Sequence, residues 1–321
     1  MPRAPLTARH RRAGFTLVEF MIALVLFAIV GGALLNVITR QQRFFRIAHE
    51  QLSTRAHMRY AGALLPTDLR PIYPTGGDVY AWRDTMLEFR QVLGSGATCQ
   101  IFPAVAATQR IGLPPLTLAR QGVLTSWLAQ PQVGDSIMLY DDGPFVGDAD
   151  NTWRPYGITA VATTTGATAC LGTFVPTAAD LAGAAYQLTL DGTVPLTVLP
   201  GAPVRVFRRA RYSFFRQASD GKWYLGYSDC LAGRVPVCST PPLAVAGPYR
   251  PYSSTDPGAT GLAFTYRDAN GAQLVPGVGA TTAIARIDVV TRTQTTPTAS
   301  YGGRAEQFRD SLKVSVGLRN R

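Results

Sequence analysis

The first 65 residues carry two successive hydrophobic patterns. Residues 15–38 are almost continuously apolar, and Glu19 is the only charged residue among them. A run of about 20 apolar residues is long enough to cross a bilayer as a helix. Farther along, apolar residues recur at the spacing of about 3.6 that marks one face of an amphipathic helix. That face comprises Phe45, Ala48, Leu52, Ala56, Tyr60 and Ala63.

Together the two patterns predict a single helix over residues 15–65, whose membrane-spanning first half ends at about residue 38. Pro66 is the expected stop, because proline lacks the amide hydrogen of a helical bond. Gly31 and Gly32 lower the helix propensity inside the apolar run. They let the segment bend, or they permit close packing against a neighbouring helix. The sequence leaves both alternatives open.

The rest of the chain has the patterns of β-strands. Residues 66–200 are rich in proline and glycine, and they contain short strand-like runs such as Ser136–Tyr140. Residues 201–321 have clearer strands; Ala285–Thr291, for example, alternates polar and apolar positions as a half-buried strand does. We therefore expect an α+β protein, in which the helix packs on an antiparallel β-sheet head, residues 201–321, with a β-rich insertion at 66–200.

Positive charge is concentrated before the apolar run. Four arginines precede it, and residues 1–14 contain no acidic residue. The four are Arg3, Arg9, Arg11 and Arg12. By the positive-inside rule, this leader keeps the N-terminus in the cytoplasm and directs the rest across the membrane. The apolar run is too long for the core of a secretory signal, and a plain signal anchor would leave Glu19 unexplained.

The overall charge is basic. The chain has 31 Lys and Arg residues against 20 Asp and Glu, which gives a formal net charge of +11. A basic surface can attract DNA or anionic lipid. The sequence shows no clustered arginine and aromatic motif typical of a nucleic-acid-binding module. DNA binding is therefore kept as the less favoured alternative to a generally basic surface.

Four cysteines follow the apolar run, namely Cys99, Cys170, Cys230 and Cys238. An even number of cysteines in an oxidising compartment indicates disulfides, and four cysteines allow three connectivities. We favour Cys230–Cys238, which closes a short loop, together with Cys99–Cys170, which closes a long one. No C-x-x-C pair occurs, which argues against a zinc ribbon or a thioredoxin-like site.

The sequence offers little for catalysis. Its three histidines are His10, His49 and His57, so residues 58–321 cannot hold a Ser-His-Asp or Cys-His arrangement. Residues 141–143 and 147–151 concentrate oxygen ligands of the kind that calcium prefers. Their spacing differs from that of an EF-hand, and such clusters usually build turns. We expect no enzyme, no cofactor and no resident metal, with calcium at these turns left open.

The junction of the leader and the apolar run resembles a known signature. Gly14-Phe15-Thr16-Leu17-Val18-Glu19 is similar to the type IV prepilin motif, a glycine followed by F-T-L-x-E. The resemblance implies that prepilin peptidase cuts between Gly14 and Phe15, removes residues 1–14 and methylates the new amine of Phe15. It also implies that Glu19 acts in subunit assembly by pairing with the N-terminal amine of a neighbouring subunit. A buried carboxylate needs such a partner.

A weaker resemblance, to minor pilins of the PilW type, extends to the C-terminus. It rests on a hairpin that contains Tyr212 and Trp223-Tyr224, on the terminal Leu318-Arg319-Asn320-Arg321, and on a length greater than that of a major pilin. It implies a subunit that initiates or caps a type IV pilus, and thereby a link to adhesion and twitching motility. It gives prepilin peptidase, other minor and major pilins and the inner membrane as partners, and no small-molecule substrate.

The resemblance also implies a location. The subunit would first be a single-pass inner-membrane protein with a periplasmic head, and would then enter the pilus fibre or its tip. Two alternatives stay open. One is a minor pseudopilin of a type II secretion system, and the other is a pilus-tip adhesin or DNA-binding subunit.

Overall fold

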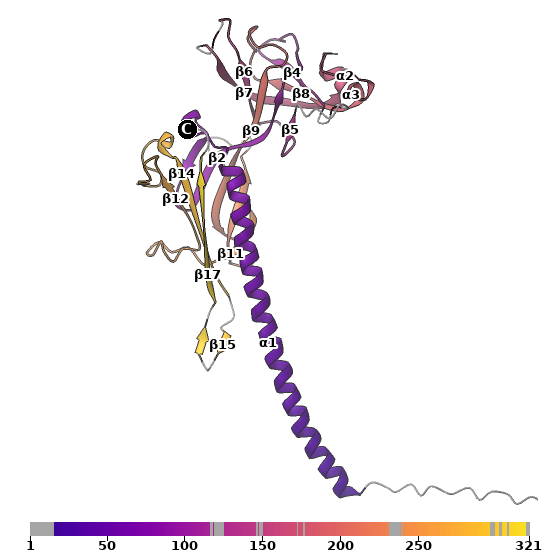
Figure 1. Ribbon diagram of the computed structural model, residues 1–321, viewed down its shortest axis with the longest axis vertical. Coiled ribbons are helices and arrows are strands. Elements are labelled where there is room, and N and C mark those ends of the chain that lie inside the picture. The colour runs from indigo at the N-terminus through magenta and orange to yellow at the C-terminus, as the bar shows by residue number, and fades with distance from the viewer. Residues whose placement is uncertain are drawn as a thin grey trace, which may run out of the picture. The chain divides into compact units, whose positions relative to one another are not determined.

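The computed structural model describes residues 16–115, 118, 125–145, 147, 150–171, 173–175, 177–230, 238, 240–295, 299–301, 304–306 and 308–318. The chain divides into two units, and each is described by itself: residues 1–53 with 295–308, and residues 54–294 with 309–321. The fold is α+β, as predicted, with one long helix followed in sequence by antiparallel strands (Figure 1).

The long helix α1 runs over Leu17–Leu69 and therefore passes the expected stop at Pro66. A proline inside a helix costs about 3 kcal/mol, because it removes one backbone hydrogen bond and crowds the preceding turn. Burial offsets that cost, since Leu65 and Leu69 are completely buried and each contributes about 1.5–3 kcal/mol. The Arg70 amide also donates to the Pro66 carbonyl, at 3.1 Å. The last turn is thus held by packing rather than by propensity.

Among the described residues, eleven strands form the large sheet, whose central path is β1-β2-β9-β6-β7-β8-β4-β3. Off this path, β10 pairs with β9 and β11, and β5 pairs with β2. The strands are β1 (Val79–Trp82), β2 (Met86–Ala97), β3 (Gln100–Ile101), β4 (Gln109–Leu113), β5 (Ser126–Trp127), β6 (Ser136–Asp141), β7 (Thr152–Thr165), β8 (Ala184–Leu190), β9 (Pro203–Arg216), β10 (Trp223–Asp229) and β11 (Leu243–Tyr249).

A second sheet has the order β13-β12-β14-β17. Its strands are β12 (Leu262–Arg267), β13 (Gln273–Leu274), β14 (Arg286–Gln294) and β17 (Arg309–Gly317). A separate pair, β15 (Ala299–Tyr301) with β16 (Arg304–Glu306), belongs to the first unit. Short helices complete the description: η1 (Pro74–Gly76), α2 (Gly166–Ala169), α3 (Ala178–Ala182) and η3 (Thr281–Ala283).

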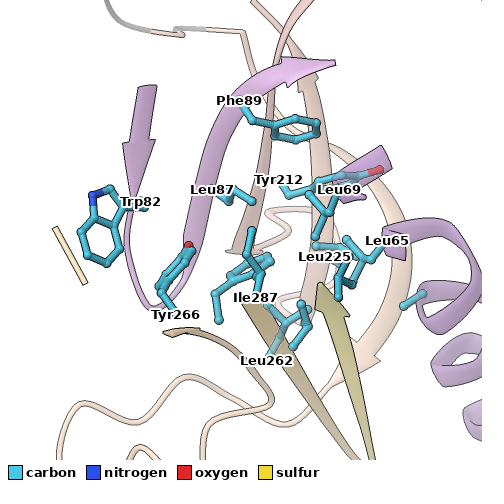
Figure 2. Packing of buried hydrophobic residues seen from close by; sticks show 14 of the residues in the cluster. Leu65, Leu69, Trp82, Leu87, Phe89, Tyr212, Leu225, Leu262, Tyr266 and Ile287 are labelled. Carbon is cyan, nitrogen blue, oxygen red and sulfur yellow. The ribbon is translucent and has the colours of Figure 1, made fainter. Parts of the chain in front are cut away.

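The end of α1 and the two sheets share one hydrophobic core, which we call the helix core. Figure 2 shows Leu65 and Leu69 of α1 facing residues of both sheets. Aromatic rings fill much of this core, with Phe89 stacked on Tyr212 at 5.7 Å and Trp82 edge-on to Tyr266 at 5.0 Å. The other labelled members are Leu87, Leu225, Leu262 and Ile287. Strands from both ends of the β-rich sequence therefore surround the helix end.

A second core, which we call the insertion core, lies among β4, β6, β7, β8 and the adjoining parts of β2 and β9. One face of the long strand β9 contributes side chains to both cores, because every second residue of a strand points to the same face. Val204 and Val206 enter the insertion core, whereas Tyr212 and Phe214 enter the helix core. In β2, a bulge between Val92 and Gly94 marks the same transition.

A buried ion pair separates the two cores. Arg208, midway along β9, donates to both carboxylate oxygens of Asp135, at 2.7 and 2.9 Å. Their side chains are only 6% and 0% exposed. Across the strand pair, Gln91 lies opposite Arg208 and accepts a hydrogen bond from the Tyr227 hydroxyl. The two parallel hydrogen bonds from Arg208 to Asp135 compensate both charges, as a buried ion pair needs good geometry to offset its loss of solvation.

Candidate functional site

The first turn of α1 contains a reciprocal pair of hydrogen bonds between Thr16 and Glu19. The Glu19 amide donates to the Thr16 hydroxyl at 3.3 Å, and the Thr16 amide donates to a Glu19 carboxylate oxygen at 3.0 Å. The Thr16 hydroxyl donates to that same oxygen at 3.0 Å. This is a capping box, which satisfies amide groups that a helix start otherwise leaves unpaired.

The capping box leaves Glu19 with capacity for a further partner. An ionised carboxylate has about four acceptor positions. Both bonds to Thr16 use one oxygen, Oε2. Glu19 is exposed, and apolar residues flank it on α1. The side chain can therefore start the helix and still receive a cation. The residues of the expected cleavage, Gly14 and Phe15, lie outside the described part of the chain.

The first half of α1 presents a continuous apolar surface. Leu17 and Phe27 are each 76% exposed, and Leu35 is 65% exposed. The helix is continuous through Gly31 and Gly32, and a Cβ added at either glycine would meet nothing within 4 Å. By length and composition α1 is the one described helix that could cross a membrane. Exposed apolar surface on this scale indicates a lipid or protein environment.

The last turns of α1 are fixed to the head, by which we mean the β-rich part of the second unit. Gly62 lies so close to β17 that a Cβ built there would be 3.0 Å from Leu312 Cδ2. The Tyr212 hydroxyl of β9 donates to the Asp68 carboxylate at 2.5 Å. Burial first, and then the Asp68 charge, raise the pKa of Tyr212, so it stays a neutral donor. Movement of the helix end is thereby coupled to the head.

The four cysteines form two disulfides, with the pairing that the sequence analysis favours. Cys99 is bonded to Cys170 across 71 residues of sequence, and Cys230 to Cys238 across 8. All four are buried. Cys99 and Cys170 lie with Ala169, Val175 and Ala185 in a small apolar cluster of their own. A long closed loop restricts the unfolded chain and so stabilises this region by a few kcal/mol.

The oxygen-rich segment builds turns where it is described. Asp141 pairs with Arg154 and accepts the Gly143 amide at 3.2 Å, and Asp150 accepts the Phe145 amide at 3.0 Å. Asp148 and Ala149 lie outside the described residues. Among those described, no group of three His, Cys, Asp or Glu side chains is arranged to hold a metal ion.

The second sheet holds a charged cluster that sequence reasoning missed. Asp288 of β14, which is 1% exposed, lies near Arg267, Arg286 and Lys313, at 3.1, 3.3 and 3.2 Å. Burial raises the pKa of Asp288, but hydrogen bonds from Ser315, Arg267 and Lys313 outweigh burial, so the pKa is below its usual value. Arg286 lies in the same alternating run as Asp288, at 285–291, whereas Arg267 and Lys313 come from the neighbouring strands β12 and β17.

The sheet also brings arginines over aromatic rings that are distant in sequence. The Arg205 guanidinium lies 5.0 Å from the centre of the Trp153 ring, and that of Arg209 lies 4.3 Å from the Tyr80 ring. Arg209 also pairs with the buried Glu88. No local motif signals these pairs, because strand pairing alone creates them. The two cation–π contacts and the ion pair of Arg209 with Glu88 are explained as support for the sheet.

Comparison with known protein families identifies the N-terminal segment. Residues 9–35 match the family model described as the prokaryotic N-terminal methylation motif. The match covers the end of the leader, the capping box and most of the apolar surface. No curated protein and no solved structure matches the chain. The terminal residues 319–321, which carried part of the finer resemblance, lie outside the described chain.

Proposed function

The chain has the N-terminus of a type IV pilin-like prepilin, and from this premise we propose that it is a minor pilin of the PilW type. In this proposal, prepilin peptidase processes the chain, and the product helps to initiate or cap a type IV pilus. The observation that carries the proposal is Glu19, the only charge in an exposed apolar helix segment, five residues after Gly14.

The first step is processing at the cytoplasmic end of the helix. Cleavage between Gly14 and Phe15 removes the arginine-rich leader, and methylation leaves a cationic secondary amine on Phe15. Thr16 then becomes the second residue of the mature chain. Its capping box supports this step, because it starts the helix with residues of the mature chain, Thr16 and Glu19.

The second step is pairing between subunits. When the apolar segment moves from lipid into a fibre, Glu19 stays in an environment of low polarity, where an isolated charge is costly. A methylated amine from a neighbouring Phe15 neutralises it and forms a charge-assisted hydrogen bond. The remaining carboxylate oxygen of Glu19, which the capping box does not use, is the acceptor. One such pair per neighbour fixes the axial register of the helices.

The third component is the head, which Leu65, Leu69 and the Asp68–Tyr212 hydrogen bond attach to the helix. A head fixed in this way follows its helix into the assembly, where it contacts other minor pilins. Two disulfides suit a periplasmic or extracellular location, since oxidising compartments preserve them.

Mass spectrometry of the membrane-purified protein tests the proposal. With prepilin peptidase present, we expect a mature chain beginning at N-methylated Phe15, and without it a chain that retains the leader. Gly14→Val should block cleavage, whereas Gly32→Val, which alters a glycine of the same apolar helix, should not. A full-length chain in the presence of active peptidase would refute the proposal. Co-purification with type II secretion subunits, and not with pilus subunits, would identify a pseudopilin instead.

A further inference from the structure

The head contains a hollow lined by three arginines, of about 270 Å³. Arg250, Arg292 and Arg309 line it together with Gly258, Asp310 and Ser311. Arg309 and Ser311 are exposed, so the hollow opens to solvent. Pockets that enclose a whole small molecule usually measure about 300–1,000 Å³. The arginine hollow is therefore at the small end of ligand sites, with room for an ion or for the end of a larger molecule.

Three segments that are distant in sequence position these arginines. The Arg250 amide, just after β11, donates to the Arg292 carbonyl of β14 at 3.0 Å. The Arg292 amide donates in turn to the Gly261 carbonyl at 2.6 Å. Arg292 lies opposite Ser311 of β17, and Arg309 is two residues before Ser311 on the same side of that strand. The backbone thus holds the three side chains at one place before any ligand arrives.

The positive charge of the hollow is largely uncompensated. Arg292 uses one nitrogen to donate to the Thr260 carbonyl at 2.9 Å. The side chains of Arg250 and Arg309 have no hydrogen bond or ion pair with any described residue. Among the described residues of the lining, Asp310 brings the only carboxylate, and it already pairs with Arg55 at 3.2 Å. Gathering three like charges is unfavourable unless an anion joins them.

We propose that the arginine hollow binds a doubly charged tetrahedral oxyanion, a phosphate or sulfate group. One arginine fork is enough for a single carboxylate, whereas several forks match an oxyanion with three or four acceptor oxygens. The group can be a free ion or the end of a larger phosphorylated molecule. This inference does not depend on the proposed role in a fibre.

Calorimetric titration of the full-length protein in detergent micelles tests the inference, with inorganic phosphate, sulfate and acetate as probes. We expect saturable binding of phosphate and sulfate and much weaker binding of acetate. Glycerol 3-phosphate distinguishes the sources, since equal or tighter binding indicates the end of a larger molecule and weaker binding indicates the free ion. Inorganic phosphate should also bind more tightly as its second proton leaves at about pH 7, while sulfate binding should not change.

Arg250→Gln and Arg309→Gln should each weaken phosphate binding about tenfold or more, which matches the loss of one charge-assisted hydrogen bond. Arg70→Gln is the matched control, because it removes one exposed arginine elsewhere in the same unit. If Arg250→Gln disturbs folding, Arg309→Gln at the exposed strand position keeps the test valid. Equal affinity in the control and in both hollow variants, or no saturable phosphate binding to the wild type, would overturn the inference.

Discussion

The two ends of α1 are both helical, but their apolar side chains lie in opposite environments. Near its start, large apolar residues such as Leu26 are more than half exposed, while near its end Leu65 is completely buried against β-strands. Both stretches contain leucine and alanine, which have high helix propensity. What differs is the environment that each side chain requires. The start needs lipid or other helices, whereas the end obtains its packing from its own chain.

The largest effect is expected at Glu19, and it concerns assembly rather than folding. Glu19→Gln removes the charge that, in the proposed mechanism, pairs with a neighbouring amine, yet keeps an oxygen for the capping box. Loss of one charge-assisted pair weakens the contact by about 1.5–3 kcal/mol, so incorporation into fibres should fall at least about tenfold. Immunoblots of sheared fibres measure this.

Glu50→Gln is the control for this experiment, because Glu50 lies on the same helix beyond the apolar segment. Its incorporation should match the wild type, and both variants should still be processed at Gly14. Wild-type incorporation of Glu19→Gln would contradict the pairing mechanism.

The next effect compares how much a leucine at each end of the helix contributes to stability. Leu65→Ala should lower the free energy of unfolding of the head by about 2–5 kcal/mol, because it opens a cavity in the helix core. Leu26→Ala removes the same atoms from an exposed position and should change it by less than about 0.5 kcal/mol. Urea denaturation in micelles, followed by tryptophan fluorescence, compares them. Equal destabilisation would mean that the first half of α1 also has packing partners within the chain.

A smaller effect is expected at Asp288, and it depends on pH. Its pKa is lowered in the folded state, so its charge stabilises the fold above the unfolded value of about 3.9 and loses that effect as pH falls below it. Asp288→Asn should therefore cost about 1–3 kcal/mol at pH 7. The difference from the wild type should shrink below about pH 4.

Denaturation curves at pH 7, 5 and 3 check this. Asp310→Asn serves as the comparison, because its pair with Arg55 is exposed and contributes about 1 kcal/mol or less. A difference between Asp288→Asn and the wild type that stays constant over this range would show that the charge of Asp288 does not stabilise the sheet.

The smallest effect belongs to the capping box. Thr16→Val keeps the shape of the side chain but removes the hydroxyl, which should destabilise the first turn by about 0.5–2 kcal/mol. Hydrogen exchange of the Glu19 amide, the group that donates to Thr16, should then accelerate. Thr39→Val is the control, since the Thr39 hydroxyl bonds to a carbonyl inside the helix and caps nothing. Unchanged exchange at Glu19 would show that the capping box does not form in the membrane.

The sequence predicts best what is encoded locally. A continuous apolar run and a 3.6-residue period are both patterns among neighbours along the chain, and they predict α1. Alternation of polar and apolar residues is a local pattern as well, and it predicts strands such as β14. The predicted stop at Pro66 is wrong, because burial of Leu69 in the helix core outweighs the low helix propensity of proline. The position of Glu19, five residues after Gly14, is also a local pattern, and it indicates the prepilin-like motif.

Pairing between distant strands is not encoded in this local way. The contacts of Asp288, the Arg208–Asp135 pair and the convergence of three arginines each require the sheet order, which no periodicity contains. The capping box is the exception. Thr16 and Glu19 have the spacing T-x-x-E, which is typical of a helix start. The residues that form the prepilin-like signature therefore also encode the capping box.

The pairing of β2 with β9 has a consequence for how such a protein can change. Ala97, the last residue of β2, lies directly opposite Pro203, the first residue of β9. Residues 98–202 therefore begin and end at adjacent points of the large sheet, and most of the insertion core lies between them. A segment with such closely spaced ends is an exchangeable cassette. It can be lengthened, shortened or replaced over generations while α1 and the helix core keep their shape, so the insertion can diverge without redesigning the part that we propose assembles.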